Sequence, residues 1–211
     1  MTNKLLWTLF IFFAVGVGLY PLMYALVDMS QGLLASKPPE LLASTFYKSA
    51  FYLHIGLGGL SLLVGWSQFN KKFRNKNLSF HRTLGKIYLI SVMISGLCGL
   101  YIAFFATGGL TSSLGFGGLA MAWLFTSSAA YRSIRSKDID SHERWMIRSY
   151  CLTFAAVTLR LWLPLSMIAG IEFVFAYRII SFLCWVPNLV VGEMIIARKS
   201  RKVGPVAGLT S

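Results

Sequence analysis

Residues 87–107 read IYLISVMISGLCGLYIAFFAT, a run of 21 residues without one charged side chain. About 20 such residues, wound as an α-helix, are long enough to cross the ~30 Å hydrocarbon core of a bilayer. In a chain of only 211 residues, lipid accommodates a helix that is apolar on every side better than a small soluble core does. This stretch therefore predicts a membrane-spanning helix, and with it the fold class.

Five further apolar runs predict an all-α polytopic integral membrane protein, a six-helix transmembrane bundle in one domain over residues 1–202. These runs cover 5–27, 49–69, 114–131, 149–170 and 176–197. The composition agrees, because only 13% of the residues are charged, about half the share in soluble domains. The first run has no small-residue cleavage site after it, so we interpret it as a retained helix and not a signal peptide. Residues 203–211 are expected to form a short cytoplasmic tail.

The basic side chains are divided very unequally between the two sides that six helices define. Sixteen of the 20 Lys and Arg residues lie on the side of the N-terminus, and three lie on the other side. The sixteen are Lys4, Lys71, Lys72, Arg74, Lys76, Arg82, Lys86, Arg132, Arg135, Lys137, Arg144, Arg148, Arg198, Lys199, Arg201 and Lys202; the three are Lys37, Lys48 and Arg178. Because Lys- and Arg-rich loops face the cytoplasm, we expect an inner (plasma) membrane protein with both termini cytoplasmic.

This topology also explains the net charge of +13, so we expect the lipid bilayer as the partner and no nucleic acid. A partner membrane protein and a homo-oligomer both stay open.

Two similar segments, GLGGL at 56–60 and GFGGL at 115–119, open the second and fourth runs. Each is followed by a basic loop and a histidine, which suggests that helices 2–3 and 4–5 form a tandem hairpin repeat. The alternative is coincidence, since glycine-rich starts and basic turns are common in membrane proteins. Such small-residue faces would let helices 2 and 4 approach closely.

His81 and His142 are expected at matching depths, at the cytoplasmic ends of the third and fifth helices. Two such imidazoles are candidate ligands for the iron of haem b or for a divalent metal, and could also relay protons. The alternative is an interfacial role at helix ends, with Ser79 and Ser141 as the N-caps. His54 lies near the outer end of the second helix and has no histidine partner at that depth. It is either a ligand or a helix-packing contact.

Arg160 lies in the middle of the fifth run, where a charge costs at least ~2.5 kcal/mol. It must face the bundle interior, extend to the interface or pair with an anion. The candidate partners are Glu172 and the phosphate or carboxylate of a bound ligand, whereas Glu193 is expected too far away. In a cofactor site, Arg148 or Arg160 would neutralise the propionates or an anionic substrate.

Several of these residues recur in one pattern. It comprises His54 with Gly58 and Gln68-Phe69, then His81-Arg82-x-x-Gly85-Lys86-x-Tyr88, His142-x-x-Trp145-Met146-x-Arg148-Ser149-Tyr150 and Thr158-x-Arg160. The pattern resembles the bacterial membrane proteins of domain of unknown function 2306, over about residues 45–197; that resemblance implies no activity. More distantly it is similar to b-type cytochrome and ferric-reductase-like helical bundles. Those carry histidine pairs at two depths, whereas only the inner pair exists here, so at most one bis-histidine haem is implied.

Three functions follow as hypotheses. The first is a redox or cofactor-binding protein using His81 and His142, which we favour slightly because it uses the residues that stand out by position. The second is a transporter or a protein that handles a lipid or an anionic small molecule through Arg160. The third is an assembly subunit of a membrane complex. The sequence contains no H-E-x-x-H, G-x-S-x-G or phosphate-binding glycine–lysine motif, so whether the protein is an enzyme stays open.

Overall fold

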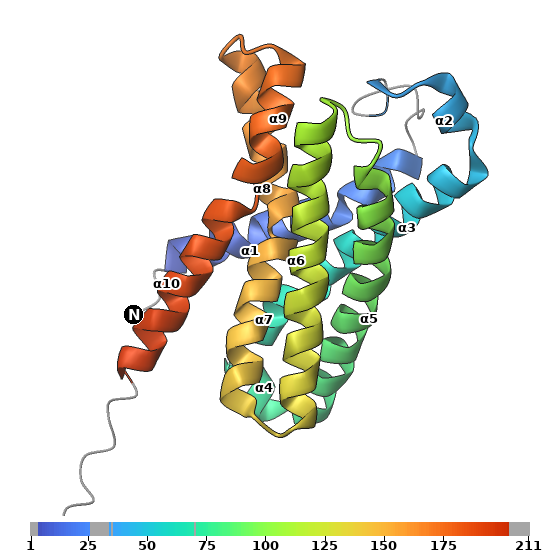
Figure 1. Ribbon diagram of the computed structural model, residues 1–211. Coiled ribbons are helices and arrows are strands. Elements are labelled where there is room, and N and C mark those ends of the chain that lie inside the picture. The colour runs from blue at the N-terminus through green and yellow to red at the C-terminus, as the bar shows by residue number, and fades with distance from the viewer. Residues whose placement is uncertain (1–3, 26–33, 35, 70, 203–211) are drawn as a thin grey trace, which may run out of the picture.

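The computed structural model describes residues 4–25, 34, 36–69 and 71–202, and within these ranges it is helical without a strand (Figure 1). The expected tail, 203–211, lies outside the described residues. The elements are α1 (Lys4–Leu19), η1 (Tyr20–Ala25), α2 (Pro39–Ala43), α3 (Thr45–Gly65), η3 (Trp66–Phe69), α4 (Lys71–Lys76), α5 (Leu78–Ala103), α6 (Leu110–Arg135), α7 (Ile139–Thr153), α8 (Ala155–Ile168), α9 (Phe173–Leu183) and α10 (Val186–Lys202).

Five helical stretches of the described chain are long and apolar enough to cross a membrane. They are Lys4–Tyr24, Thr45–Phe69, Leu78–Ala103, Ile139–Ile168 and Phe173–Arg201. An all-helical membrane protein is therefore confirmed, whereas the count of six helices and the tandem repeat are not. The remaining predicted helix corresponds to α6, which buries Ser112, Thr126 and Ser127 together with glycines and is less hydrophobic for that reason.

Four helices form a bundle around the main core. α3 packs on α5, α5 on α6, α6 on α7, and α7 again contacts α3, so α5 and α7 face each other across the bundle. α1 crosses obliquely behind these helices, α9 packs against α6 and α8, and α10 packs against α7 (Figure 1). The bundle interior holds the fully buried Tyr88 and Leu62 beside Trp123, Tyr150 and Val157.

The helices α5 and α7 begin one turn before His81 and His142. Asn77 caps α5 by accepting a hydrogen bond from the amide of Phe80 at 3.2 Å. Asp138 caps α7 by accepting from the amide of Ser141 at 2.9 Å. The interpretation of Ser79 and Ser141 as N-caps is therefore wrong, because Asn and Asp, which are equally good caps, lie closer to the true helix starts.

We call this end of the bundle the basic end. It carries α4, the starts of α5 and α7 and the end of α6, with exposed cations that include Arg82, Lys86, Arg132 and Arg135. The opposite end carries α2, the start of α3 and the turns before α6 and α9.

Two long helices are interrupted next to each other. α7 gives way to α8 at Phe154, and α9 gives way to α10 at Cys184. Asn188 lies between the breaks: its Nδ2 donates to the carbonyls of Cys151 at 3.2 Å and Cys184 at 3.0 Å, and it lies 3.2 Å from Thr158 Oγ1. Backbone groups freed inside a membrane need such partners because no water is available.

The glycine-rich segments mediate close helix contacts, but not with each other. A Cβ atom at Gly59 would lie 2.5 Å from the carbonyl oxygen of Gly18, where α3 meets α1. A Cβ atom at Gly115 would lie 2.2 Å from Ser181 Oγ, where α6 meets α9. The expectation that these faces join the second and fourth predicted helices is therefore wrong, because α1 and α9 occupy them.

Candidate functional site

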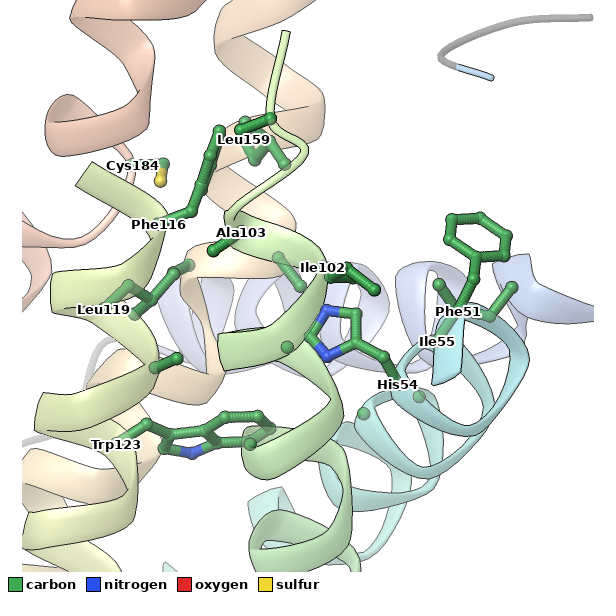
Figure 2. A pocket seen from close by; sticks show the side chains of 18 of the residues that line it. Phe51, His54, Ile55, Ile102, Ala103, Phe116, Leu119, Trp123, Leu159 and Cys184 are labelled. Atoms are coloured by element: carbon green, nitrogen blue, oxygen red, sulfur yellow. The ribbon is translucent and has the colours of Figure 1, made fainter. Parts of the chain in front are cut away.

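A cavity of about 230 Å³ lies among α3, α5, α6 and α8. Figure 2 shows its mostly apolar wall, to which Phe51, Ile102, Phe116 and Leu119 contribute. It extends from Trp123, in the middle of α6, to the opposite end of the bundle. No carboxylate is among the described residues that line it.

Arg160 on α8 lines this cavity. Its Nη1 donates to the carbonyl of Ala156 at 3.0 Å, and its Cζ lies 4.5 Å from the ring centroid of Tyr20, in a cation–π contact. A guanidinium carries five N–H donors, and within the described part of the chain this is its one hydrogen bond. Arg160 is therefore a mostly buried cation whose hydrogen-bonding capacity is largely unused.

The two carboxylates considered for Arg160 have other partners. Glu172 caps α9, accepting hydrogen bonds from the amides of Val174 at 2.8 Å and Phe175 at 2.7 Å. These two donors lower the pKa of the Glu172 carboxyl. Glu193 pairs with Arg148. Among the described residues, no carboxylate forms an ion pair with Arg160.

His54 also lines the cavity and is held in one orientation. Its Nδ1 lies 2.9 Å from the carbonyl oxygen of Ser95, while the Ser95 hydroxyl donates to the carbonyl of His54 at 2.8 Å. The ring packs against Gly99, where a Cβ atom would come within 2.8 Å of it. Since Nδ1–H is the donor to the Ser95 carbonyl, the neutral ring keeps Nε2 as an acceptor for the cavity (Figure 2).

The end of the cavity nearest α2 contains polar groups that the sequence analysis did not single out. Lys37 donates to Thr107 Oγ1 at 3.0 Å and to the carbonyl of Phe105, and burial lowers the pKa of its ammonium to about 8. Tyr47 and Tyr177, only 2% and 7% exposed, line the same space. Their hydroxyls have no hydrogen-bond partner among the described residues. No sequence pattern distinguished the two tyrosines, because aromatic residues are abundant in every apolar run.

His81 and His142 lie in the first turns of α5 and α7, at the basic end and outside the cavity. His142 Nδ1 lies 2.8 Å from the carbonyl oxygen of Ala130 on α6, which leaves Nε2 for another partner. His81 Nδ1 is buried and has no hydrogen-bond partner in the described chain, and the same holds for Gln68 Oε1. The structure thus places both histidines at one end of the bundle, on helices that face each other.

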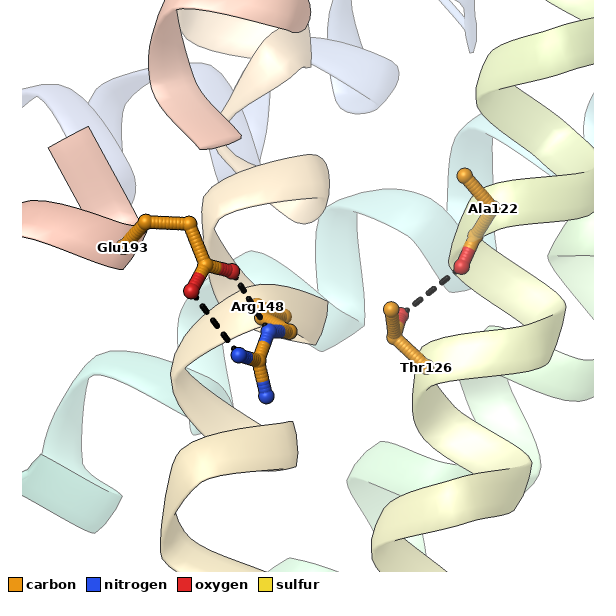
Figure 3. Close-up of polar contacts among 4 residues, drawn as sticks. All are labelled: Ala122, Thr126, Arg148 and Glu193. Carbon is orange, nitrogen blue, oxygen red and sulfur yellow. Dashed lines mark hydrogen bonds and ion pairs between the residues drawn. The ribbon is translucent and has the colours of Figure 1, made fainter. Parts of the chain in front are cut away.

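Arg148 is engaged elsewhere. Figure 3 shows its bidentate contact with Glu193, with Nε–Oε1 2.6 Å and Nη2–Oε2 2.8 Å, which joins α7 to α10. The guanidinium also lies 4.6 Å from the Trp145 ring. A second ion pair, Lys199 with Glu143, joins the same helices. Arg148 therefore fastens α10 to the bundle.

The number of potential metal ligands limits the kind of metal centre that the site residues could form. Within the described ranges no group of three or more His, Cys, Asp and Glu residues could hold a metal ion. The cysteines Cys98, Cys151 and Cys184 are free, and Cys184 lines the cavity. A metal centre at the basic end would therefore depend on two imidazoles.

A comparison with known proteins places these features in a family. A family model described as "Predicted membrane protein (DUF2306)" matches residues 51–196, which include all five site residues proposed from the sequence. No curated protein and no solved structure matches the chain.

Proposed function

The chain belongs to the DUF2306 family of predicted membrane proteins, and we propose that it binds an amphipathic anion in the cavity beside Arg160. The observation that carries the proposal is a cation that no carboxylate of the described residues pairs with, next to a cavity that none of those carboxylates lines. An unpaired charge in a low-dielectric interior is costly. An anionic ligand would neutralise the charge and use the free N–H donors.

The surroundings of Arg160 indicate the rest of the ligand. Phe51, Phe116, Leu119 and Trp123 give the cavity an apolar wall, which suits a hydrocarbon chain or ring. The volume of about 230 Å³ lies below the roughly 300–1,000 Å³ of pockets that enclose a drug-sized ligand. That space suits a head group with the first part of a chain, while the remainder would lie between the helices or in the lipid.

The proposal includes an orientation. We place the basic end at the cytoplasmic surface, because excess Lys and Arg mark cytoplasmic loops, and we propose that α6 is a sixth span. α6 has the same 26 residues as its spanning neighbour α5 and packs between α5 and α7. The cavity would then lie in the outer half of the membrane.

The ligand should be retained through gentle purification. We propose to extract the protein from its native membrane, wash it in a neutral detergent and identify bound molecules by negative-ion mass spectrometry. Wild type and Arg178→Gln should carry the same amphipathic anion, and Arg160→Gln should lack it. Arg178 is a matched control because it is a cation on α9 that bonds the carbonyl of Gly108 outside the cavity. Equal retention by all three proteins would refute a role for Arg160.

A second candidate function, binding of one haem b, rests on the histidines at the basic end. It is supported by two imidazole nitrogens that have no hydrogen-bond partner among the described residues, Nδ1 of His81 and Nε2 of His142, and by the position of their helices across the bundle. Those nitrogens would be the axial ligands, and haem would supply one-electron redox chemistry. Wild type and His54→Ala, purified after haem-replete expression, should then show a b-type reduced-minus-oxidised spectrum that His81→Ala and His142→Ala lack. Absence of the spectrum from wild type would eliminate this candidate.

A further inference from the structure

The polar groups of the cavity are not evenly distributed. Besides Arg160 and His54, they gather at the end nearest α2: Lys37 and the hydroxyls of Tyr47 and Tyr177. All of these groups line the same cavity, and we call them the polar cluster.

This cluster consists almost entirely of donors. Arg160 offers the N–H groups that its bond to Ala156 leaves free, and Lys37 has three donors for the two acceptors at Phe105 and Thr107. Tyr47 and Tyr177 each offer one O–H. The oxygens of these hydroxyls and the Nε2 atom of His54 can also accept. A ligand that satisfies the donors of the cluster needs several acceptor oxygens.

The charged side chains of the cavity narrow the choice of head group further. Two cations, Arg160 and Lys37, line the cavity, and no carboxylate lines it among the described residues. A carboxylate or a sulfate ester would neutralise only one of them. A phosphate monoester carries about −1.5 to −2 charges near pH 7 and three acceptor oxygens.

We infer that the head group held in this cavity is a phosphate monoester on a hydrocarbon tail, bound by Arg160, Lys37 and the hydroxyls of Tyr47 and Tyr177. This inference rests on the proposed function and makes it more specific. The phosphate lies in the outer half of the bundle, and the tail follows the apolar wall toward Trp123.

Calorimetric titration of the purified protein in zwitterionic nanodiscs tests the inference. The probes share one ten-carbon tail: decyl phosphate, decyl sulfate, decanoate and decanol, with inorganic phosphate as the tail-free probe. Decyl phosphate should bind at least tenfold more tightly than the other four. Equal affinity for the three amphipathic anions would overturn the phosphate assignment while supporting the proposed function. Binding of none would overturn both.

Inorganic phosphate distinguishes a lipid head group from free phosphate. If it binds as tightly as decyl phosphate, the head-group assignment stands and the amphipathic ligand is refuted.

Tyr47→Phe and Tyr177→Phe remove one hydroxyl each without changing shape. Each should weaken decyl phosphate binding by about three- to tenfold and leave decanoate unchanged. Tyr131→Phe is the control, because Tyr131 is exposed near the end of α6 and lies outside the cavity. If a substitution weakens the binding of decyl phosphate and of decanoate by the same factor, the hydroxyl only shapes the cavity.

Discussion

Arg160 lies over the face of Tyr20, with its guanidinium carbon 4.5 Å from the ring centroid, and no carboxylate in the described chain pairs with it. A cation–π contact of this kind contributes about 0.5–2 kcal/mol. That is less than the cost of about 2.5–3.5 kcal/mol for an arginine at the centre of a bilayer on the permissive insertion scale. Under the proposed function, an anionic ligand supplies the remaining stabilisation.

The first prediction is that Arg160 opposes stability in the ligand-free protein. Arg160→Leu removes the desolvated charge and keeps most of the volume, so it should raise the free energy of unfolding by about 1–3 kcal/mol. Thermal melts in neutral detergent measure the change. Decyl phosphate should raise the melting temperature of wild type but not of the variant. A large loss of stability in Arg160→Leu would mean that protein contacts already satisfy the cation.

The second prediction concerns pH. Burial lowers the pKa of Lys37 to about 8, so its ammonium is present below that pH and is lost above it. Phosphate monoesters gain their second charge above about pH 6. Lys37 shares the cavity with Arg160, His54, Tyr24, Tyr47 and Tyr177. The affinity for decyl phosphate should therefore be highest between about pH 6 and 8 and fall on both sides.

Substitution of Lys37 separates its titration from that of its neighbours. Lys37→Met should bind decyl phosphate more weakly at pH 7 and lose the decline above pH 8. Lys37→Arg should keep the affinity at pH 7 and hold it to higher pH. If the decline above pH 8 persists in Lys37→Met, another group causes it.

The third prediction contrasts two glycines of α3. A Cβ atom at Gly65 would lie 2.3 Å from a ring atom of Tyr150, whereas at Gly56 nothing lies within 4 Å. Gly65→Ala should therefore destabilise the protein by about 1–3 kcal/mol through overpacking. Gly56→Ala should be neutral or stabilise it by up to about 1 kcal/mol. Urea or thermal unfolding of both variants checks this, and equal stabilities would contradict the close packing of α3 on α7.

The fourth prediction concerns the two neighbouring helix breaks, at Phe154 between α7 and α8 and at Cys184 between α9 and α10. Asn188 bonds carbonyls at both interruptions, so Asn188→Leu should cost about 1–2 kcal/mol of stability. Val190→Leu, on the exposed side of α10, should be neutral. Thermal unfolding compares the two, and a neutral Asn188→Leu would show that the breaks do not need this side chain.

The sequence predicted the membrane class and most of the long helices, because apolar length and charge position are local properties. It also singled out Arg160 and His54, which the structure brings to one cavity. It did not find Tyr47, Tyr177 or Lys37 at that cavity, since their proximity depends on packing among α3, α9 and the segment before α2. It assigned Arg148 to a ligand, whereas the fold supplies Glu193 from α10, a contact between residues far apart in the chain.

The central claim is that Arg160 holds an anionic ligand. The most direct test is the dissociation constant of decyl phosphate for wild type, Arg160→Gln and Arg178→Gln, measured by calorimetry at pH 7. A charged hydrogen-bond partner contributes about 1.5–3 kcal/mol, so Arg160→Gln should bind about 10- to 100-fold more weakly. Arg178→Gln should match wild type. Equal affinities for all three proteins would contradict the account.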